Sequence, residues 1–156
     1  MDLRDPEDRD EGELLTLWRE LMDHHARLDP RFELGKSADA RFRDYLDVAR
    51  AREDYRVRVA ELKGEVAGFI VACVLPNSPV YAHRWIGYIN DLCVTERHRG
   101  QGVGRALVED ASNWLLSSGA DRVEVYVALA NEQARSFWRR MGAAEYLERL
   151  VLLEQA

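Results

Sequence analysis

The sequence predicts one domain, residues 1–156, with a mixed α/β fold in which antiparallel strands come first and a parallel pair of strands follows. Apolar or alternating segments up to Val94 are joined by short turns, which favours antiparallel pairing. Beyond Val94 the order strand, helix, strand requires a parallel crossover. The continuous apolar run 66–75 is typical of a strand covered by helices on both faces of a sheet.

The N-terminal third predicts a short strand at Leu3-Arg4 and two amphipathic helices. Asp10, with Glu13 three residues later, marks the start of the first helix, and Asp29-Pro30 ends it. Ser37 is a suitable cap for the second helix. Each helix has an apolar stripe at helical spacing: Leu14, Trp18, Leu21, Met22 and His25 in the first, and Phe42, Tyr45, Leu46 and Ala49 in the second.

Turn residues divide the remaining chain into strands and helices. Lys63-Gly64-Glu65 is a tight turn, and prolines at both ends of the loop 76–79 stop the flanking strands. Gly119 and Gly142 are expected to end helices, and Asn131 to cap one. The expected strands are 56–62, 66–75, 81–94, 121–127 and a closing strand at 147–153, and the expected helices are 103–118 and a short one after Asn131.

Composition limits the classes of partner and compartment. A net charge of −6 argues against nucleic acid as the main partner. The longest apolar run is shorter than the roughly 20 residues that span a bilayer, and no basic-then-apolar leader opens the sequence, so we expect a cytoplasmic protein without a membrane partner. Cys73 and Cys93 are then buried reduced thiols, with a disulfide or a catalytic thiol as alternatives. No histidine or cysteine spacing indicates a metal site.

The run Arg99-Gly100-Gln101-Gly102-Val103-Gly104 joins an apolar strand to a helix. Glycines at alternate positions let a ligand reach the backbone, and the first amides of a helix attract anions, most often phosphates. Gly104-Arg105-Ala106 lacks the Gly-Lys-Ser/Thr ending of a nucleotide P-loop. A dinucleotide fingerprint would place a third glycine where Leu107 stands. The anion is therefore expected to belong to another kind of phosphate ligand.

The pattern Arg99-x-x-Gly102-x-Gly104 resembles the acyl-CoA signature Gln/Arg-x-x-Gly-x-Gly/Ala of the GNAT N-acetyltransferases. Tyr88 to Val94 is similar to the central strand that precedes this signature in the family, and Asn131-x-x-Ala134-x-x-Phe137-Trp138-x-x-x-Gly142 is similar to its last helix. Three blocks in the family's order and spacing identify the chain as a member over roughly residues 56 to 147. The N-terminal third matches only in outline.

The resemblance implies a GNAT-like acyl-CoA N-acyltransferase fold, in which the two central parallel strands splay apart and admit the pantetheine arm of acetyl-CoA. It implies that the turn amides bind the pyrophosphate, with Arg99 and Arg105 close by. It places the backbone of the central strand's end on the thioester and Asn131 on the cofactor or an ordered water. The implied cofactor residues are Leu92, Cys93, Val94, Arg99, Gly100, Gln101, Gly102, Val103, Gly104, Arg105, Asn131, Phe137 and Trp138.

Two positions depart from the family pattern. Asn90 stands where many members carry a glutamate base, and Trp138 replaces the usual tyrosine acid. Asn90 can orient a water but cannot accept a proton near neutral pH, and an indole N–H does not give up its proton. Asp91 is the candidate base, provided that a β-bulge turns it toward the cleft. Tyr126 is the first candidate acid, followed by Tyr88, Tyr81 and water.

These residues predict an N-acetyltransferase that transfers the acetyl group of acetyl-CoA by direct attack of a primary amine on a small molecule or peptide. A catalytically weakened acyl-CoA-binding module or sensor is the alternative that Asn90 and Trp138 favour. A third reading, an interaction protein with a purely structural turn, conflicts with the intact glycine run. The apolar tail 150–153 is suited either to joining a second subunit in a homodimer or to closing the sheet.

Overall fold

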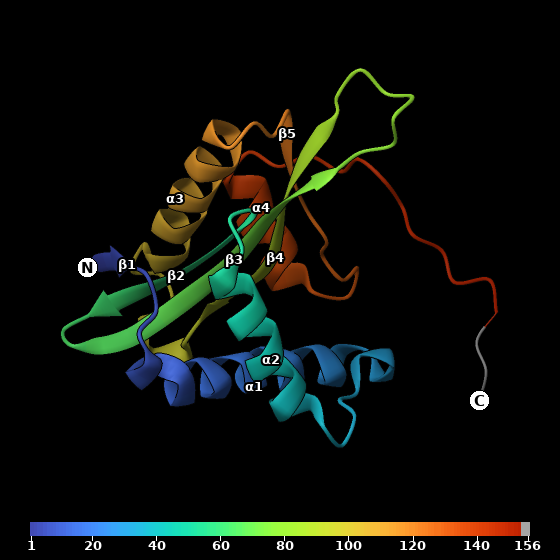
Figure 1. Cartoon of the computed structure of the whole chain (residues 1–156). Helices are drawn as coiled ribbons and strands as arrows, with labels where there is room; N and C mark the ends of the chain where they lie inside the picture. The colour runs from blue at the N-terminus through green and yellow to red at the C-terminus, as the bar shows by residue number, and fades with distance from the viewer. Residues whose placement is uncertain (154–156) are drawn as a thin grey trace.

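The computed structural model describes residues 1–153 and contains one five-stranded sheet with the strand order β1-β2-β3-β4-β5 (Figure 1). Four α-helices and three short 3-10 turns complete the described chain. The strands are β1 (Asp2–Arg4), β2 (Tyr55–Leu62), β3 (Glu65–Pro76), β4 (Trp85–Val94) and β5 (Arg122–Val125); the helices are α1 (Glu11–Leu28), α2 (Ala38–Ala51), α3 (Val103–Ser117) and α4 (Glu132–Arg140).

The predicted mixed α/β sheet is confirmed. The first four strands pair antiparallel in sequence order, and β5 pairs parallel with β4 after the α3 crossover. The parallel pairing extends only from Ile86↔Arg122 to Ile89↔Val125, whereas β4 continues to Val94. Within the described residues, the second half of β4 therefore has no strand on its β5 side. This is the splay that the family resemblance implied.

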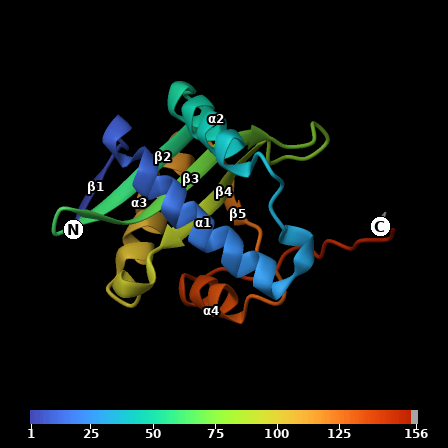
Figure 2. The same ribbon diagram turned by 90° about the horizontal axis from the view of Figure 1, so that it is seen from below.

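Helices cover both faces of the sheet, as predicted. On one face, α1 and α2 pack side by side on a core that includes Leu17, Leu46 and Phe69 (Figure 2). On the other face, α3 packs through Leu107 and Leu115 against β3 and β4, and the apolar side of α4 adds to the same core. Val66 to Val74 of β3 are all buried, because both core layers meet on this strand.

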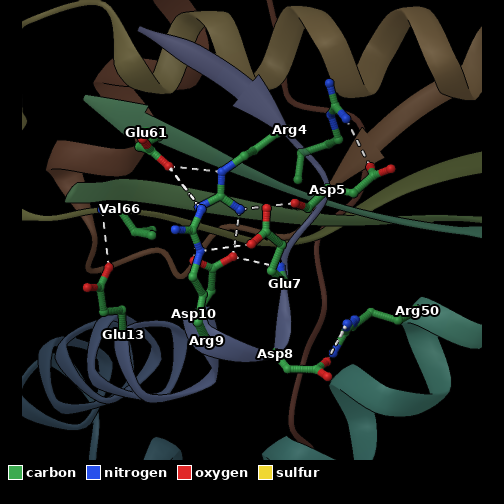
Figure 3. Close-up of polar contacts among 11 residues, drawn as sticks. Arg4, Asp5, Glu7, Asp8, Arg9, Asp10, Glu13, Arg50, Glu61 and Val66 are labelled. Carbon is green, nitrogen blue, oxygen red and sulfur yellow. Dashed lines mark hydrogen bonds and ion pairs between the residues drawn. The ribbon is translucent and has the colours of Figure 1, made fainter. Parts of the chain in front are cut away.

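A buried ion pair fixes the chain between β1 and α1 (Figure 3). Both Nη atoms of Arg4 donate to the Asp10 carboxylate at 2.7 and 2.9 Å, and its Nε donates to Glu61 of β2 at 3.0 Å. Asp10 is only 3% exposed. Although α1 begins after Asp10 as expected, the Asp10 side chain does not cap this helix, and Glu13 instead accepts from the amide of Val66 at 3.2 Å. The two residues that predicted the helix start therefore connect α1 to the sheet instead of capping the helix.

Three predicted strands differ from the structure. The strand expected at 121–127 is the shorter β5, Arg122–Val125, so Tyr126 lies beyond its end. β4 begins at Trp85 rather than at 81, because the Asp121 carboxylate accepts from the amides of Arg84 and Trp85 at 2.7 and 3.0 Å and ends the preceding loop there. The closing strand at 147–153 is wrong: these residues have no regular structure, and Figure 1 shows the chain leaving the body of the molecule. Just before this segment, Tyr146 lies under the guanidinium of Arg122 on β5.

Candidate active site

The glycine turn has the geometry expected of an anion site. Gly100 and Gly102 have φ of +75° and +84°, and a Cβ at either position would meet no atom within 4 Å, so the backbone faces open space. The first bond of α3 runs from the amide of Ala106 to the carbonyl of Gly102. The amides of Val103, Gly104 and Arg105 thus precede the first helical hydrogen bond and point out of the helix start.

The basic side chains of this turn are held by the protein itself. Arg99 Nε donates to the carbonyl of Val94 at 3.1 Å, and Arg105 lies 3.3 Å from Glu109 one turn along α3. Arg97 pairs with Glu65 at 2.9 Å, and His98 is turned toward the same carboxylate at 3.9 Å. Because the Arg105 pair is exposed and long, it contributes little and can open to an anion.

Leu92, Cys93 and Val94 form the end of β4 beside the open side of the sheet. Gly68 of β3 permits a very close approach here, since a Cβ at this position would lie 2.5 Å from the Cys93 carbonyl oxygen. The Cys93 thiol donates to the carbonyl of Leu17 at 3.1 Å, and burial raises its pKa to about 12. Cys73 is likewise buried and free. The burial expected of both cysteines is confirmed.

A β-bulge in β4 brings Asn90 and Asp91 to one face of the sheet. The register passes from Val71↔Asp91 to Ala72↔Ile89, so Asn90 is the extra residue on its strand. Asn90 Oδ1 accepts from the Cys73 thiol at 3.2 Å, and Asp91 faces Tyr45 of α2. Ile89 and Leu92, in contrast, pack on the α3 side. The bulge that Asp91 needed in order to face the α1–α2 side is present.

Burial raises the pKa of Asp91 to about 6, and the hydroxyl of Tyr45 opposes part of this rise. Burial also raises the pKa of Tyr45 well above its usual range, so this hydroxyl keeps its proton. It is buried and has no hydrogen bond of good geometry among the described residues. Asp91 is therefore a carboxylate that changes its charge close to neutral pH, the property expected of a general base.

Tyr126 directly follows β5, at the point where the pairing of β4 with β5 ends. Its ring stacks on Tyr88 of β4, with centroids 5.9 Å apart and an interplanar angle of 9°. Tyr126 is 72% exposed, whereas burial raises the pKa of Tyr88 to about 12. In register, Tyr88 pairs with Glu124, so a continued ladder would bring Tyr126 toward the bulge at Asn90. The two rings therefore mark the point where the parallel strands separate.

The residues of the last helix have structural partners. Asn131 is 5% exposed, and its Oδ1 caps α4 by accepting from the amide of Ala134 at 3.0 Å. Phe137 and Trp138 contact each other edge to face at 5.1 Å and pack on the α3 core. Gly104 makes this packing possible, because a Cβ there would lie 3.3 Å from the Phe137 ring. Asn131, Phe137 and Trp138 thus hold α4 in place beside the glycine turn.

The sequence did not single out the residues that line one further pocket. A cavity of about 560 Å³ lies between Trp18 of α1, the residues before α2 and the first turns of α2. Its wall includes Phe42 and Tyr45, which the sequence indicated only as buried stripe residues, and the cations Lys36 and Arg41. All its lining residues except Trp18 lie within 34–45, so the cavity depends on the packing of Trp18 of α1 against this segment.

Comparison with known proteins agrees with this geometry. A model of the Acetyltransferase (GNAT) family matches residues 18–143, and the chain belongs to this family. It is 32% identical to an uncharacterized N-acetyltransferase of Archaeoglobus fulgidus over 96 residues, which are 62% of this chain and 65% of that protein, just under two thirds of its length.

Two further proteins match nearly the whole chain, one in sequence and one in fold. The thialysine N-epsilon-acetyltransferase of Bos taurus is 25% identical over 94% of this chain and 85% of that protein. A crystal structure of a tetramutant of the BH1408 protein from Bacillus halodurans has a TM-score of 0.85 at 24% identity, over 99% of this chain and 100% of that chain. Among the described residues, no helix has the length and apolar character needed to cross a membrane.

Proposed function

We propose that this protein transfers the acetyl group of acetyl-CoA to a primary amine of a small molecule or peptide. The observation that carries the proposal is the open glycine turn at the start of α3, next to the unpaired half of β4. Family membership supports acetyl transfer in general terms. The Bos taurus relative is named for acetylation of an amine, which favours the same acceptor class.

The residues present fit acetyl-CoA. The backbone is open at Gly100 and Gly102, and the amides from Gln101 to Gly104 would hold the diphosphate, with Arg99 and Arg105 adding positive charge. Leu92, Cys93 and Val94 would bind the peptide-like pantetheine arm, and a backbone amide there would stabilise negative charge on the carbonyl oxygen. Phe137 and Trp138 would pack behind it. When bound, acetyl-CoA supplies a thioester whose C–S bond breaks as the amide bond forms.

Asp91 is the proposed general base, and Asn90 its neighbour that orients a water. With a pKa of about 6, Asp91 is mostly ionised at neutral pH and can accept the proton that an ammonium substrate loses, directly or through that water. Tyr126 is the proposed donor of a proton to the leaving thiolate, because it is exposed at the mouth of the splay. Trp138 takes no part in proton transfer.

An acyl-CoA-binding module is the second candidate, and two observations favour it. Asn90 cannot serve as a base, and Trp138 cannot serve as an acid. In this alternative the turn holds the coenzyme, but no amine is acetylated. The two proposals therefore differ in turnover and agree in binding.

A paired measurement tests both. We expect coenzyme A at about 100 times its Kd to raise the melting temperature by roughly 5 °C or more. Gly102→Glu should abolish this shift by placing a carboxylate in the diphosphate site. Gly64→Glu is the matched control, because Gly64 has φ of +82°, faces open space and lies in the β2–β3 turn. Equal shifts in both variants would show that the glycine turn does not bind coenzyme A.

Free thiol release with acetyl-CoA and a panel of primary amines then separates enzyme from module. Turnover that depends on one class of amine supports acetyl transfer. A full thermal shift without turnover on any amine contradicts it and supports the module. Asp91→Asn, which keeps the shape of the side chain, should retain the thermal shift while losing turnover.

We further propose that a second copy of the chain covers the open edge of β5. Within residues 1–153, β5 is hydrogen-bonded only to β4, so its other edge is free to pair. From Leu147 to Leu153 the chain runs away from the body, and Leu150, Leu152 and Leu153 are 79%, 92% and 89% exposed. Exchange of this segment between two copies would cover both surfaces and close as a symmetric dimer.

A further inference from the structure

The cavity of about 560 Å³ beside α1 and α2 has the size of a small-molecule site. One wall is aromatic: Trp18 and Phe42 stack with ring centroids 4.3 Å apart and an interplanar angle of 9°, and Tyr45 continues the wall along α2. Leu34 and Gly35, which precede α2, complete the apolar lining. Such a wall suits the carbon skeleton of an acceptor.

Two positively charged side chains, Lys36 and Arg41, also line this cavity. Neither makes an ion pair with another described residue, although most arginines of the described chain do. No aspartate or glutamate of residues 1–153 lines the cavity. The nearby carboxylate of Asp39 is already bound by Arg19 at 2.6 Å. Two uncompensated positive charges in a chain of net charge −6 create a local preference for an anion.

Tyr45 connects this cavity to the proposed base. Its ring lines the cavity, and its hydroxyl faces the carboxylate of Asp91 on β4. Arg41 precedes Tyr45 by four residues of α2, which corresponds to about 6 Å along the helix. Asp91 does not itself line the cavity; an acceptor that lies along the aromatic wall would extend from the two cations toward Tyr45, beyond which Asp91 lies.

We propose that the acceptor is an anionic amine: a primary amine at one end of a short chain or ring, with a carboxylate or a phosphate at the other. Lys36 and Arg41 bind the anionic end, the aromatic wall holds the middle, and the amine lies toward Asp91. This assignment rests on the proposed acetyl transfer and adds the class of acceptor. It also explains why the acceptor side carries positive charge although the nucleophile is itself cationic before it loses its proton.

Matched amines test the assignment. Free thiol release is measured with acetyl-CoA and either 6-aminohexanoate or hexylamine, and with either 3-aminopropyl phosphate or propylamine. We expect kcat/KM to be about tenfold higher or more for an anionic member of a pair, which two partly exposed ion pairs can supply. Comparison of the two pairs shows whether carboxylate or phosphate is preferred. Equal kcat/KM within both pairs overturns the proposal.

The double variant Lys36→Gln, Arg41→Gln should remove most of this preference through KM and leave the thermal shift by coenzyme A unchanged. Lys63→Gln, Arg84→Gln is the control, because it removes the same charge and neither residue lines the cavity. If the preference survives in the first variant, or falls equally in the second, Lys36 and Arg41 do not form the anion site.

A binding measurement distinguishes failure of this proposal from failure of acetyl transfer. If no amine is acetylated, titration calorimetry with 6-aminohexanoate and 3-aminopropyl phosphate, in the presence of coenzyme A, still reports on the cavity. Binding of either compound that the Lys36→Gln, Arg41→Gln variant loses supports the anion site while acetyl transfer fails. Absence of heat with both compounds overturns the anion site.

Discussion

At the scale of single residues, the site depends on one extra residue in β4. Without the bulge, Asn90 and Asp91 would point to opposite faces of the sheet. With it, both face α1 and α2, and the half-buried Asp91 lies against Tyr45. The same burial that makes Asp91 a base near neutral pH also makes it unfavourable for folding, because the ionised form has lost part of its hydration.

This conflict predicts opposite effects of Asp91→Asn on activity and on stability. We expect kcat to fall about 100-fold or more, because a proton acceptor is lost. The wild-type rate should rise with pH through about 6, where Asp91 ionises, and the variant should lose this limb. Since the folded-state pKa lies above the ordinary value of 3.8, ionisation destabilises the fold at neutral pH. The free energy of unfolding of the variant at pH 7 should therefore exceed that of the wild type by at least about 1 kcal/mol.

Tyr45→Phe provides the matching control for this pH effect. Its hydroxyl lowers the pKa of Asp91, so its removal should move the acid limb of the rate profile to higher pH. The profile is measured as kcat against pH with one amine. A limb that stays at the same pH in this variant would mean that another group titrates there.

At the scale of elements, β1 and the start of α1 are joined by one buried pair. Asp10 accepts two hydrogen bonds from Arg4 and one from the amide of Glu7 at 2.7 Å. These bonds favour the charged form and hold the pKa of the Asp10 carboxyl below its usual range. Asp8, in the same short turn, pairs with Arg50 at 3.0 Å but is 97% exposed (Figure 3). The two aspartates thus differ both in burial and in the number of hydrogen bonds that they accept.

Asp10→Asn should lower the free energy of unfolding by about 2 kcal/mol at pH 7, because it leaves the Arg4 charge with Glu61 as its remaining partner. Asp8→Asn should have an effect too small to resolve in the same denaturant titration. The Asp10 contribution is present above pH 3.8 and is lost as pH falls through the lowered pKa, so the two proteins should converge in acid. A difference that persists there would contradict an ionic origin.

The elements also show how far sequence reasoning extends. Periodicity located α1, α2 and α3, since each has its own apolar stripe, and glycine spacing located the turn before α3. The bulge at Asn90 and the start of β4 at Trp85 depend on partners elsewhere, namely Val71 of β3 and Asp121 after α3. The cavity at Lys36 and Arg41 likewise requires α1 and α2 to be placed together. These three features depend on contacts between distant parts of the chain, so local sequence patterns do not predict them.

At the scale of the whole molecule, an apolar segment and an unpaired strand edge lie in the same region. The closing strand expected at 147–153 does not form within the chain, and Tyr146, just before this segment, lies under the Arg122 guanidinium. An exposed edge together with an exposed apolar segment is an arrangement that folded proteins cover. A second copy offers both surfaces in complementary form, because each chain gives one segment and receives another.

We therefore expect the protein to have a mass of about 36 kDa in solution, twice the 18.0 kDa of one chain, when measured by light scattering after size-exclusion chromatography. Leu150→Glu with Leu152→Glu should yield a monomer, because alternate residues of a strand share one face and two charges on it oppose burial. Leu116→Glu, at a 52% exposed position of α3, is the control and should remain a dimer. A wild-type protein that is monomeric at all concentrations would mean that the edge of β5 is left open or is covered by its own chain, and a dimer that persists in the double variant would mean that another surface joins the copies.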